Sequence, residues 1–205
     1  MSQHGFGYHA NRCTGCKTCM LACKDYHDLP FEIDYRQVYE YGGGTCRLNG
    51  EGRFEDTTFS YYLTVSCNHC DDPACIKVCP TKAMHRNELG LVEVDAGRCI
   101  GCGYCAFACP YGASTVDRAA GHSVKCNGCS ERVAEGKLPI CVESCPMRAL
   151  EFGEAADMAQ VGERADIAPL PSKDYTGPNL YVRPCANAKP AGSLDGAVLN
   201  TLEVE

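Results

Sequence analysis

The hydrophobic pattern of the chain consists of short β-type stretches that recur along it. The clearest are residues 59–65 (FSYYLTV) and residues 91–95 (LVEVD), which are rich in β-branched and aromatic side chains. Such stretches are typical of short strands. Shorter candidates occur at residues 5–9 and 122–125. The pattern therefore predicts strands at four separate places.

Each predicted strand leads into a group of closely spaced cysteines. Short helical segments are expected within two of these groups, at residues 74–78 and 140–144, and a turn at residues 87–90 leads into the next strand. The recurring unit is a strand, a cysteine-bearing loop and a helix, so the sequence is an internal repeat. Short strands and short helices mixed in this way predict an α+β fold.

Composition makes the cysteines the first feature to explain. The chain has 205 residues, of which 18 are cysteine and none is tryptophan, and its hydrophobic fraction is 45%. Without the cysteines the hydrophobic core is thin, and small domains of that kind usually need disulfides or metals. Disulfides suit secreted proteins, but residues 1–11 contain no apolar stretch that could serve as a signal peptide. Metal ligation is therefore the favoured interpretation.

Sixteen of the cysteines fall into four groups of four. The first and third groups are spaced C-x2-C-x2-C-x3-C, the second C-x2-C-x4-C-x3-C and the fourth C-x2-C-x11-C-x3-C. Proline follows directly in the last three groups, as Pro80, Pro110 and Pro146, and Lys24 takes that place in the first. In sequence order the groups are Cys13, Cys16, Cys19 and Cys23; Cys67, Cys70, Cys75 and Cys79; Cys99, Cys102, Cys105 and Cys109; and Cys126, Cys129, Cys141 and Cys145.

This spacing suits iron–sulfur cubanes better than zinc. Three thiolates with two residues between each can surround three irons of one cluster, and the fourth, about a helical turn further on, points elsewhere. In two-cluster bacterial ferredoxins this fourth cysteine binds the other cluster, and proline follows it. Zinc usually takes two separated C-x2-C pairs, so only the fourth group, with its x11 gap, is also compatible with zinc. The sequence predicts four iron–sulfur clusters.

Spacing leaves open which groups pair. The short gap from Cys79 to Cys99 holds one turn and one strand, as the middle of a ferredoxin does. Pairing the second group with the third leaves the first with the fourth. However, the gap from Cys109 to Cys126 is also short, so pairing the first group with the second and the third with the fourth is equally compatible.

Four segments of the chain resemble the four-cluster iron–sulfur subunits of molybdopterin oxidoreductases, and are most similar to the branch of anaerobic dimethyl sulfoxide reductases. The segments are RCTGCKTCMLACKD, SCNHCDDPACIKVCP, RCIGCGYCAFACPYG and KCNGCSERVAEGKLPICVESCPMRAL. The resemblance extends from near residue 5 to near residue 190. It implies four [4Fe–4S] clusters and a pairing of the first group with the fourth and of the second with the third.

The resemblance also implies which cysteines bind each cluster. Cys102 occupies a position that is tryptophan in the related nitrate reductase subunits, whose cluster there has three irons, so a full [4Fe–4S] cluster is expected here. The implied ligands are Cys13, Cys16, Cys19 and Cys145 for cluster 1; Cys23, Cys126, Cys129 and Cys141 for cluster 2; Cys67, Cys70, Cys75 and Cys109 for cluster 3; and Cys79, Cys99, Cys102 and Cys105 for cluster 4.

The implied architecture is two ferredoxin-like two-cluster domains, one nested in the other, with long loops and an extended C-terminal arm. The split domain is expected at residues 1–58 and 115–150, the inserted domain at residues 59–114 and the arm at residues 151–205. In this last part the cysteine pattern stops and the sequence is rich in Pro, Gly and Ala. It lacks the apolar periodicity to fold alone. We expect it to dock on a partner subunit rather than to be a disordered tail.

The expected function is electron transfer without catalysis. The formal net charge is −7 and the sequence has no basic run, which argues against nucleic acid and anionic membrane surfaces as partners. It has no Gly-rich phosphate loop for a nucleotide or flavin and no apolar stretch that could span a bilayer. The resemblance implies anaerobic respiration, in which a membrane anchor subunit oxidises quinol and the electrons reach a molybdopterin catalytic subunit that reduces dimethyl sulfoxide or another S- or N-oxide.

Other functions remain open. Related subunits serve formate dehydrogenases, polysulfide reductases and hydrogenases, and a free soluble polyferredoxin or a structural zinc protein are further alternatives. The expected location is peripheral on a membrane within a complex. Clusters would be assembled in the cytoplasm, and co-export with the catalytic subunit favours the periplasmic face. Cys46 and Cys185 are expected to be spare thiols, and His69 is expected to pack its loop rather than to tune a reduction potential.

Overall fold

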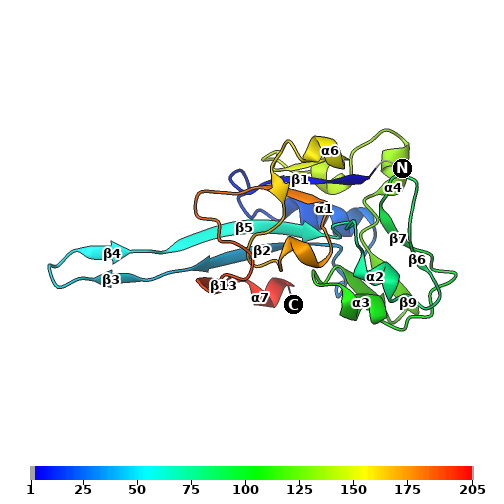
Figure 1. Ribbon diagram of the computed structural model, residues 1–205, viewed down its shortest axis with the longest axis horizontal. Coiled ribbons are helices and arrows are strands. Elements are labelled where there is room, and N and C mark those ends of the chain that lie inside the picture. The colour runs from blue at the N-terminus through cyan, green and yellow to red at the C-terminus, as the bar shows by residue number, and fades with distance from the viewer. Residues whose placement is uncertain (1–2, 205) are drawn as a thin grey trace.

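The computed structural model describes residues 3–204, which form small sheets joined by short helices (Figure 1). The helices in sequence order are α1 (Thr18–Tyr26), α2 (Ala74–Lys77), α3 (Tyr104–Ala108), α4 (Ser130–Ala134), α5 (Ile140–Glu143), α6 (Ala155–Met158), the 3-10 helix η1 (Lys173–Tyr175) and α7 (Thr201–Val204). The strands are β1 (His4–His9), β2 (Arg36–Gly43), β3 (Cys46–Leu48), β4 (Phe54–Asp56), β5 (Phe59–Ser66), β6 (Met84–Arg86), β7 (Val92–Val94), β8 (Ser114–Asp117), β9 (His122–Lys125), β10 (Leu150–Glu154), β11 (Glu163–Arg164), β12 (Leu180–Arg183) and β13 (Gly196–Val198). The expected α+β class is confirmed.

Two sheets form the centre of the molecule. The first has the strand order β10–β1–β12–β11, in which β1 is antiparallel to β10 and parallel to β12. The second has the order β13–β2–β5, and its strands are antiparallel. The hairpins β6–β7 and β8–β9 lie at the end of the molecule that carries α2 and α3 (Figure 1).

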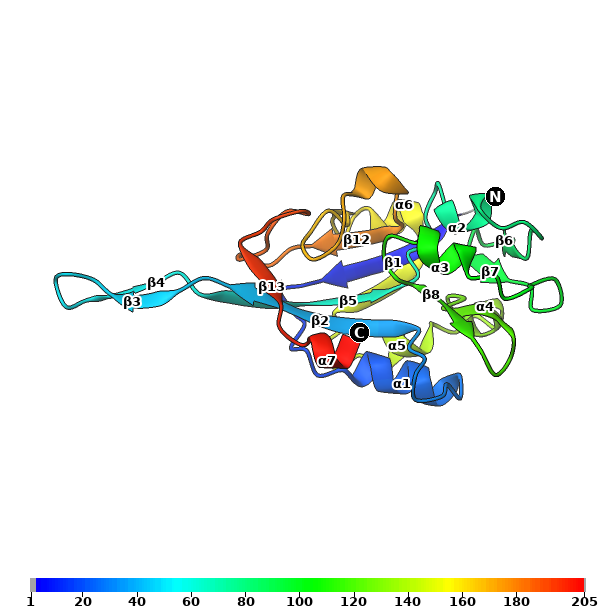
Figure 2. The ribbon, with the colours of Figure 1, turned by 90° about the horizontal axis from the view of Figure 1, so that it is seen from below.

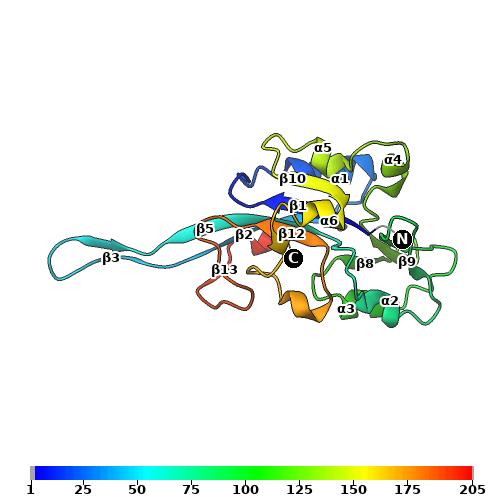
Figure 3. The same cartoon turned by 45° about the horizontal axis from the view of Figure 1, so that its top comes forward.

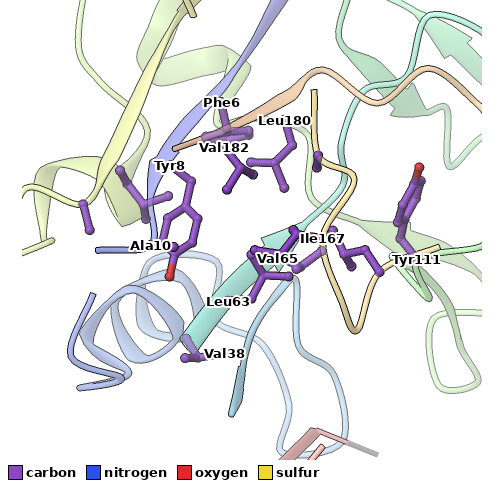
Figure 4. Close-up of a cluster of buried hydrophobic side chains, with 14 of the residues drawn as sticks. Phe6, Tyr8, Ala10, Val38, Leu63, Val65, Tyr111, Ile167, Leu180 and Val182 are labelled. Atoms are coloured by element: carbon purple, nitrogen blue, oxygen red, sulfur yellow. The ribbon is translucent and has the colours of Figure 1, made fainter. Parts of the chain in front are cut away.

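The hydrophobic core lies between strands of these two sheets (Figure 4). The Tyr8 hydroxyl of β1 donates a hydrogen bond to the carbonyl of Tyr62 in β5 at 2.6 Å and so connects the sheets. A second cluster of buried residues, around the β6–β7 hairpin, contains little besides Met84, Val92 and Cys105. The core around the second and third cysteine groups is therefore small. The main core includes Phe6, Tyr8, Val38, Leu63, Val65, Leu180 and Val182.

The elements that the sequence predicts are present. The strands expected at residues 5–9, 59–65, 91–95 and 122–125 are β1, β5, β7 and β9, and the two expected helices are α2 and α5. These helices and α3 end just before Pro80, Pro146 and Pro110, because proline disfavours helical backbone in the residue before it. Lys24 imposes no such limit, and α1 continues past Cys23.

A long hairpin projects from the body of the molecule (Figure 1). Strands β2 and β5 pair along their whole length, and β3 and β4 extend the hairpin with residues that are all exposed. From the sequence, residues 41–58 are expected only as a stretch that separates two cysteine groups. The expected domain boundary at residue 59 coincides with the start of β5, whose hydrogen bonds run to β2.

The C-terminal segment is extended, and much of it packs on the protein's own body. Strand β12 lies between β1 and β11 in the first sheet, and β13 pairs with β2 in the second. The fully buried side chain of Asn179 donates hydrogen bonds to the His69 carbonyl at 2.9 Å and to the carboxylate of Asp71 at 2.8 Å. This segment therefore supports the loop of the second cysteine group, and its docking on a partner stays a prediction.

The cysteine-bearing helices pack in two pairs. Helix α1 contacts α5, and α2 contacts α3. The two pairs lie on opposite sides of the central strands, as Figures 2 and 3 show. The first cysteine group thus adjoins the fourth, and the second adjoins the third.

Candidate metal centres

The cysteines of the four groups gather around four places, which we call sites 1 to 4. Three are cavities that four cysteines line: site 1 with Cys13, Cys16, Cys19 and Cys145, site 3 with Cys67, Cys70, Cys75 and Cys109, and site 4 with Cys79, Cys99, Cys102 and Cys105. At site 2, burial and then the charges of neighbouring thiols raise the pKa of Cys23; these neighbours are Cys126, Cys141 and Cys129. Each site thus combines three cysteines of one group with the last cysteine of another.

The short helices explain this exchange of cysteines. Cys19 and Cys23 are four residues apart on α1, so they lie on the same face about one turn from each other. The helix therefore presents Cys19 to site 1 and Cys23 to site 2. Cys141 and Cys145, on and just after α5, face the same two sites in the opposite order. Helices α2 and α3 connect sites 3 and 4 in the same way.

Left-handed backbone recurs at one position of every cysteine loop. The residue just before the second cysteine has a positive φ in all four groups: Gly15 (68°), His69 (44°), Gly101 (66°) and Gly128 (71°). Glycine adopts this conformation readily, whereas histidine does so at a cost. The turn directs backbone N–H groups toward sulfur, because Gly128 N lies 3.3 Å from Cys126 Sγ and His69 N lies 3.5 Å from Cys67 Sγ.

Further donors point at the sulfur atoms. Backbone N–H groups also donate to Cys79, Cys99 and Cys145, from Met84 at 3.4 Å, Ser123 at 3.3 Å and Ala149 at 3.4 Å. The Thr176 hydroxyl, from the C-terminal segment, donates to Cys70 Sγ at 3.2 Å. Hydrogen bonds of this kind stabilise negative charge on sulfur ligands. They indicate that the thiols serve as thiolates.

Burial opposes ionisation of the same thiols when no metal is bound. It raises the pKa of Cys70, Cys75 and Cys141 to about 12. These groups are therefore neutral at physiological pH unless a positive charge lies beside them. Iron would supply that charge and release the protons.

The donor set fits a polynuclear iron–sulfur cluster. Within residues 3–204, no three His, Cys, Asp or Glu side chains converge closely enough to bind a single metal ion. The thiols of sites 1, 3 and 4 instead surround small cavities of similar size. Four thiols around a small enclosed space, with N–H groups directed at sulfur, are the environment that a cubane requires.

Two buried cations near the sites were not predicted from the sequence. Arg36 of β2 is 2% exposed, and the charges of thiols from sites 1 and 2 act on its guanidinium group. Lys125 is also buried and lines site 3. The sequence could have indicated Lys125 as a cation near a site, because it directly precedes Cys126, and Arg12 and Arg98 also directly precede cysteine groups. Nothing in the local sequence marks Arg36.

The two remaining cysteines line none of the three cavities. Cys46 is exposed on β3 of the projecting hairpin, and Cys185 is half-buried after β12. All 18 cysteines lie within the described residues and are free thiols.

Comparison with known proteins identifies the family. The family model described as 4Fe-4S dicluster domain matches residues 58–155, and the one described as 4Fe-4S binding domain matches residues 10–29. The B subunit of anaerobic dimethyl sulfoxide reductase from Escherichia coli (strain K12) is 52% identical over 204 residues, which cover 99% of each protein. This protein belongs to the family of B subunits of anaerobic dimethyl sulfoxide reductases.

Other relatives show the breadth of this similarity. The B subunit of the same enzyme from Haemophilus influenzae is 50% identical over the full length of both proteins. The B subunit of polysulfide reductase from Wolinella succinogenes is 38% identical over 157 residues, 76% of this protein and 78% of the relative. As a member of this family, the protein is an iron–sulfur electron-transfer subunit with ferredoxin-like 4Fe-4S domains. Within residues 3–204, no helix combines the length and apolarity needed to cross a membrane.

Proposed function

We propose that the protein holds four [4Fe–4S] clusters, one at each of sites 1 to 4, and catalyses no reaction itself. The observation that carries the proposal is a set of three cavities, each lined by four cysteines. In each cavity, three of the cysteines come from one group and the fourth comes from another group. When bound, the clusters supply one-electron redox chemistry. The residues of the protein provide the thiolates, donate hydrogen bonds to sulfur and exclude water.

The four sites form a series in the order 1, 2, 3, 4. Helices α1 and α5 connect sites 1 and 2, and α2 and α3 connect sites 3 and 4. Between these pairs, the thiols of Cys67 in site 3 and Cys126 in site 2 are close enough for their charges to interact. Cys16 and Cys102, at the two ends, are exposed. Exposed ends suit electron exchange with other subunits.

The surface at site 4 supports a docked partner. Ile100 and Tyr104 are exposed and line site 4 with Cys102, and Phe107, on the same helix as Tyr104, is 92% exposed. A cluster of exposed apolar side chains beside a functional site is typical of an interface. We assign this face to a membrane anchor subunit that oxidises quinol. The site 1 end then faces a molybdopterin catalytic subunit, and the protein is peripheral to the membrane, with the periplasmic face favoured.

The same arrangement supports the domain division that the sequence predicts. Residues 1–58 and 115–150 would form the split domain with sites 1 and 2, and residues 59–114 the inserted domain with sites 3 and 4. Packing of α1 on α5 and of α2 on α3 supports this division. Residues 151–205 would form the arm.

Dimethyl sulfoxide, or another S- or N-oxide, is the proposed terminal acceptor of the complex. The support is identity of about one half over the whole sequence with B subunits of dimethyl sulfoxide reductases. Relatives from polysulfide and thiosulfate reductases are 38% and 39% identical over about three quarters of it.

Metal analysis and co-purification test the proposal. Anaerobically purified protein should contain about sixteen irons and sixteen sulfides per molecule, the content of four cubanes. A value near half of that, or a predominance of zinc, contradicts four clusters. Mass spectrometry of the native complex should identify a molybdopterin reductase subunit and a membrane subunit. A protein that purifies as a separate monomer would instead indicate a free polyferredoxin. A co-purifying catalytic subunit of a formate dehydrogenase or hydrogenase would contradict the proposed S- or N-oxide acceptor.

A further inference from the structure

The backbone of Val92 in β7 joins two side chains from different cysteine groups. Its N–H donates to Nδ1 of His69 at 2.9 Å, and its carbonyl accepts a hydrogen bond from Nζ of Lys125. His69 lies two residues after Cys67 of the second group, whereas Lys125 directly precedes Cys126 of the fourth. One residue therefore fixes both side chains where the two groups meet.

The hydrogen bond from Val92 sets the protonation of the His69 ring. His69 is fully buried. Because Nδ1 accepts the Val92 N–H, the ring hydrogen lies on Nε2. That atom is buried and has no hydrogen-bond partner among the described residues, and it lies against the loop of Gly128, whose own N–H donates to Cys126 Sγ. The Cys126 sulfur of that loop is the atom on which the His69 side chain acts.

Lys125 points the other way. Its ammonium group has three N–H donors, and two of them reach carbonyl oxygens, those of Val92 and, at 2.6 Å, of Cys126. The third is left for the cavity of site 3, which Lys125 lines. Cys67 and Cys75 of site 3 line the same cavity.

We propose that His69 and Lys125 form a crossed pair of positioning residues. Each belongs to the segment that provides cysteines to one of sites 2 and 3, and its side chain acts on the cluster of the other site. His69, from a loop of site 3, donates to Cys126 of site 2. Lys125, at the end of β9 just before a loop of site 2, places its charge at Cys67 of site 3. The inference rests on the proposed function, since it assumes a cluster at each site.

The consequence is a local control of reduction potential where the two halves of the series meet. Reduction adds negative charge, which a hydrogen bond to sulfur and a nearby cation both favour. The pair therefore raises the potentials at sites 2 and 3. No cysteine-bearing helix within residues 3–204 connects these two sites, and the hydrogen bonds of Val92 are among the contacts that join them.

Redox titration of the anaerobic complex, followed by EPR, tests the crossed pair. The variants Cys129→Ser and Cys75→Ser assign the signals of sites 2 and 3. His69→Asn removes the Nε2 donor but keeps a residue that tolerates left-handed backbone, and it should lower the potential of site 2. Lys125→Met removes the charge at similar length and should lower the potential of site 3 more than that of site 2.

Conservative and exposed variants are the controls. His69→Gln restores an N–H donor and Lys125→Arg restores the charge, so each should recover much of the shift. Lys77→Met removes an exposed lysine from α2, where water screens its charge, and should shift site 3 far less. A shift in the reduction potential of site 3 instead of site 2 in His69→Asn would overturn the crossed arrangement. So would equal effects of Lys125→Met and Lys77→Met.

A second measurement needs no substitution of His69. Pulsed EPR of reduced protein labelled with 15N-histidine should show nitrogen coupling to the site 2 cluster. It is made in a His27→Asn background, because Nε2 of His27 lies 3.5 Å from Cys129 Sγ of the same site. Absence of the coupling overturns the inference. Failure of the proposed function is recognised separately, by wild-type protein with fewer than about sixteen irons.

Discussion

The guanidinium group of Arg36 lies over the ring of Phe6, 4.8 Å from its centroid, inside the molecule. Two of its nitrogens donate to the hydroxyls of Thr64 at 3.1 Å and Ser66 at 2.9 Å. Its Nε has no partner among the described residues. A buried cation needs a negative partner, and the thiols of sites 1 and 2 surround this one.

Arg36 should therefore stabilise the loaded protein. Loss of one partner from a buried ion pair typically costs about 3–5 kcal/mol, so Arg36→Met should weaken retention of iron at sites 1 and 2. The measurement is iron content and the rate of cluster loss on warming. Arg47→Met removes an exposed arginine of β3 and is the control. Equal iron retention in the two variants would show that Arg36 is not a counter-charge.

Removal of the clusters should unfold the region of sites 3 and 4 most completely. The core of that region contains little besides Met84, Val92 and Cys105, so the clusters provide most of its cross-links. Apoprotein prepared by chelation should lose a cooperative thermal transition. Its amides in β6 to β9 should also lose hydrogen-exchange protection before those of β1 and β12. A sharp, native-like melting transition of the apoprotein would contradict this dependence.

Cys102→Ser should interrupt electron flow at the end of the series. The substitution leaves Cys79, Cys99 and Cys105 at site 4, so the cluster should lose one iron and give a new EPR signal in the oxidised state. Quinol-driven activity should be lost, whereas activity with a donor that reduces the catalytic subunit directly should remain. Cys46→Ser, at an exposed thiol outside the sites, should change neither. Full quinol-driven turnover by Cys102→Ser would place site 4 outside the conducting series.

Alanine substitutions at two glycines with similar backbone conformation distinguish the cost of backbone strain from the cost of steric overlap. Gly15 (φ 68°) and Gly112 (φ 62°) both have left-handed backbone, so alanine should cost about 1–2 kcal/mol at each. A Cβ on Gly15 would also overlap the ring of Tyr62, whereas one on Gly112 meets nothing within 4 Å. Overpacking adds about 1–3 kcal/mol. Gly15→Ala should therefore lower the temperature of cluster loss more than Gly112→Ala, and equal effects would show that Tyr62 moves aside.

The sequence by itself determined the local parts of this protein. Three local features act within a few residues of one another: cysteines four residues apart on one short helix, glycine before the second cysteine in three groups, and proline after the fourth cysteine in three groups. Their geometry follows from backbone dihedral angles, which is why α2 and α5 could be predicted, whereas β1 and β5 were predicted from their β-branched and aromatic residues. The resemblance carried by the same segments identified the family, which the comparisons confirm. The hydrophobic pattern did not predict the hairpin within residues 41–58. The exposed strands β3 and β4 have no buried face, so burial imposes no alternation of hydrophobic and polar residues on them.

Only the tertiary structure decided which distant parts meet. Spacing left the pairing of the cysteine groups open, and the packing of α1 on α5 and of α2 on α3 places the first group beside the fourth. The parallel pairing of β12 with β1, the hydroxyl of Thr176 at Cys70 and the burial of Arg36 also join residues far apart in the sequence. Such contacts depend on which surfaces fit together once the whole protein is compact, and no short window of sequence records that fit.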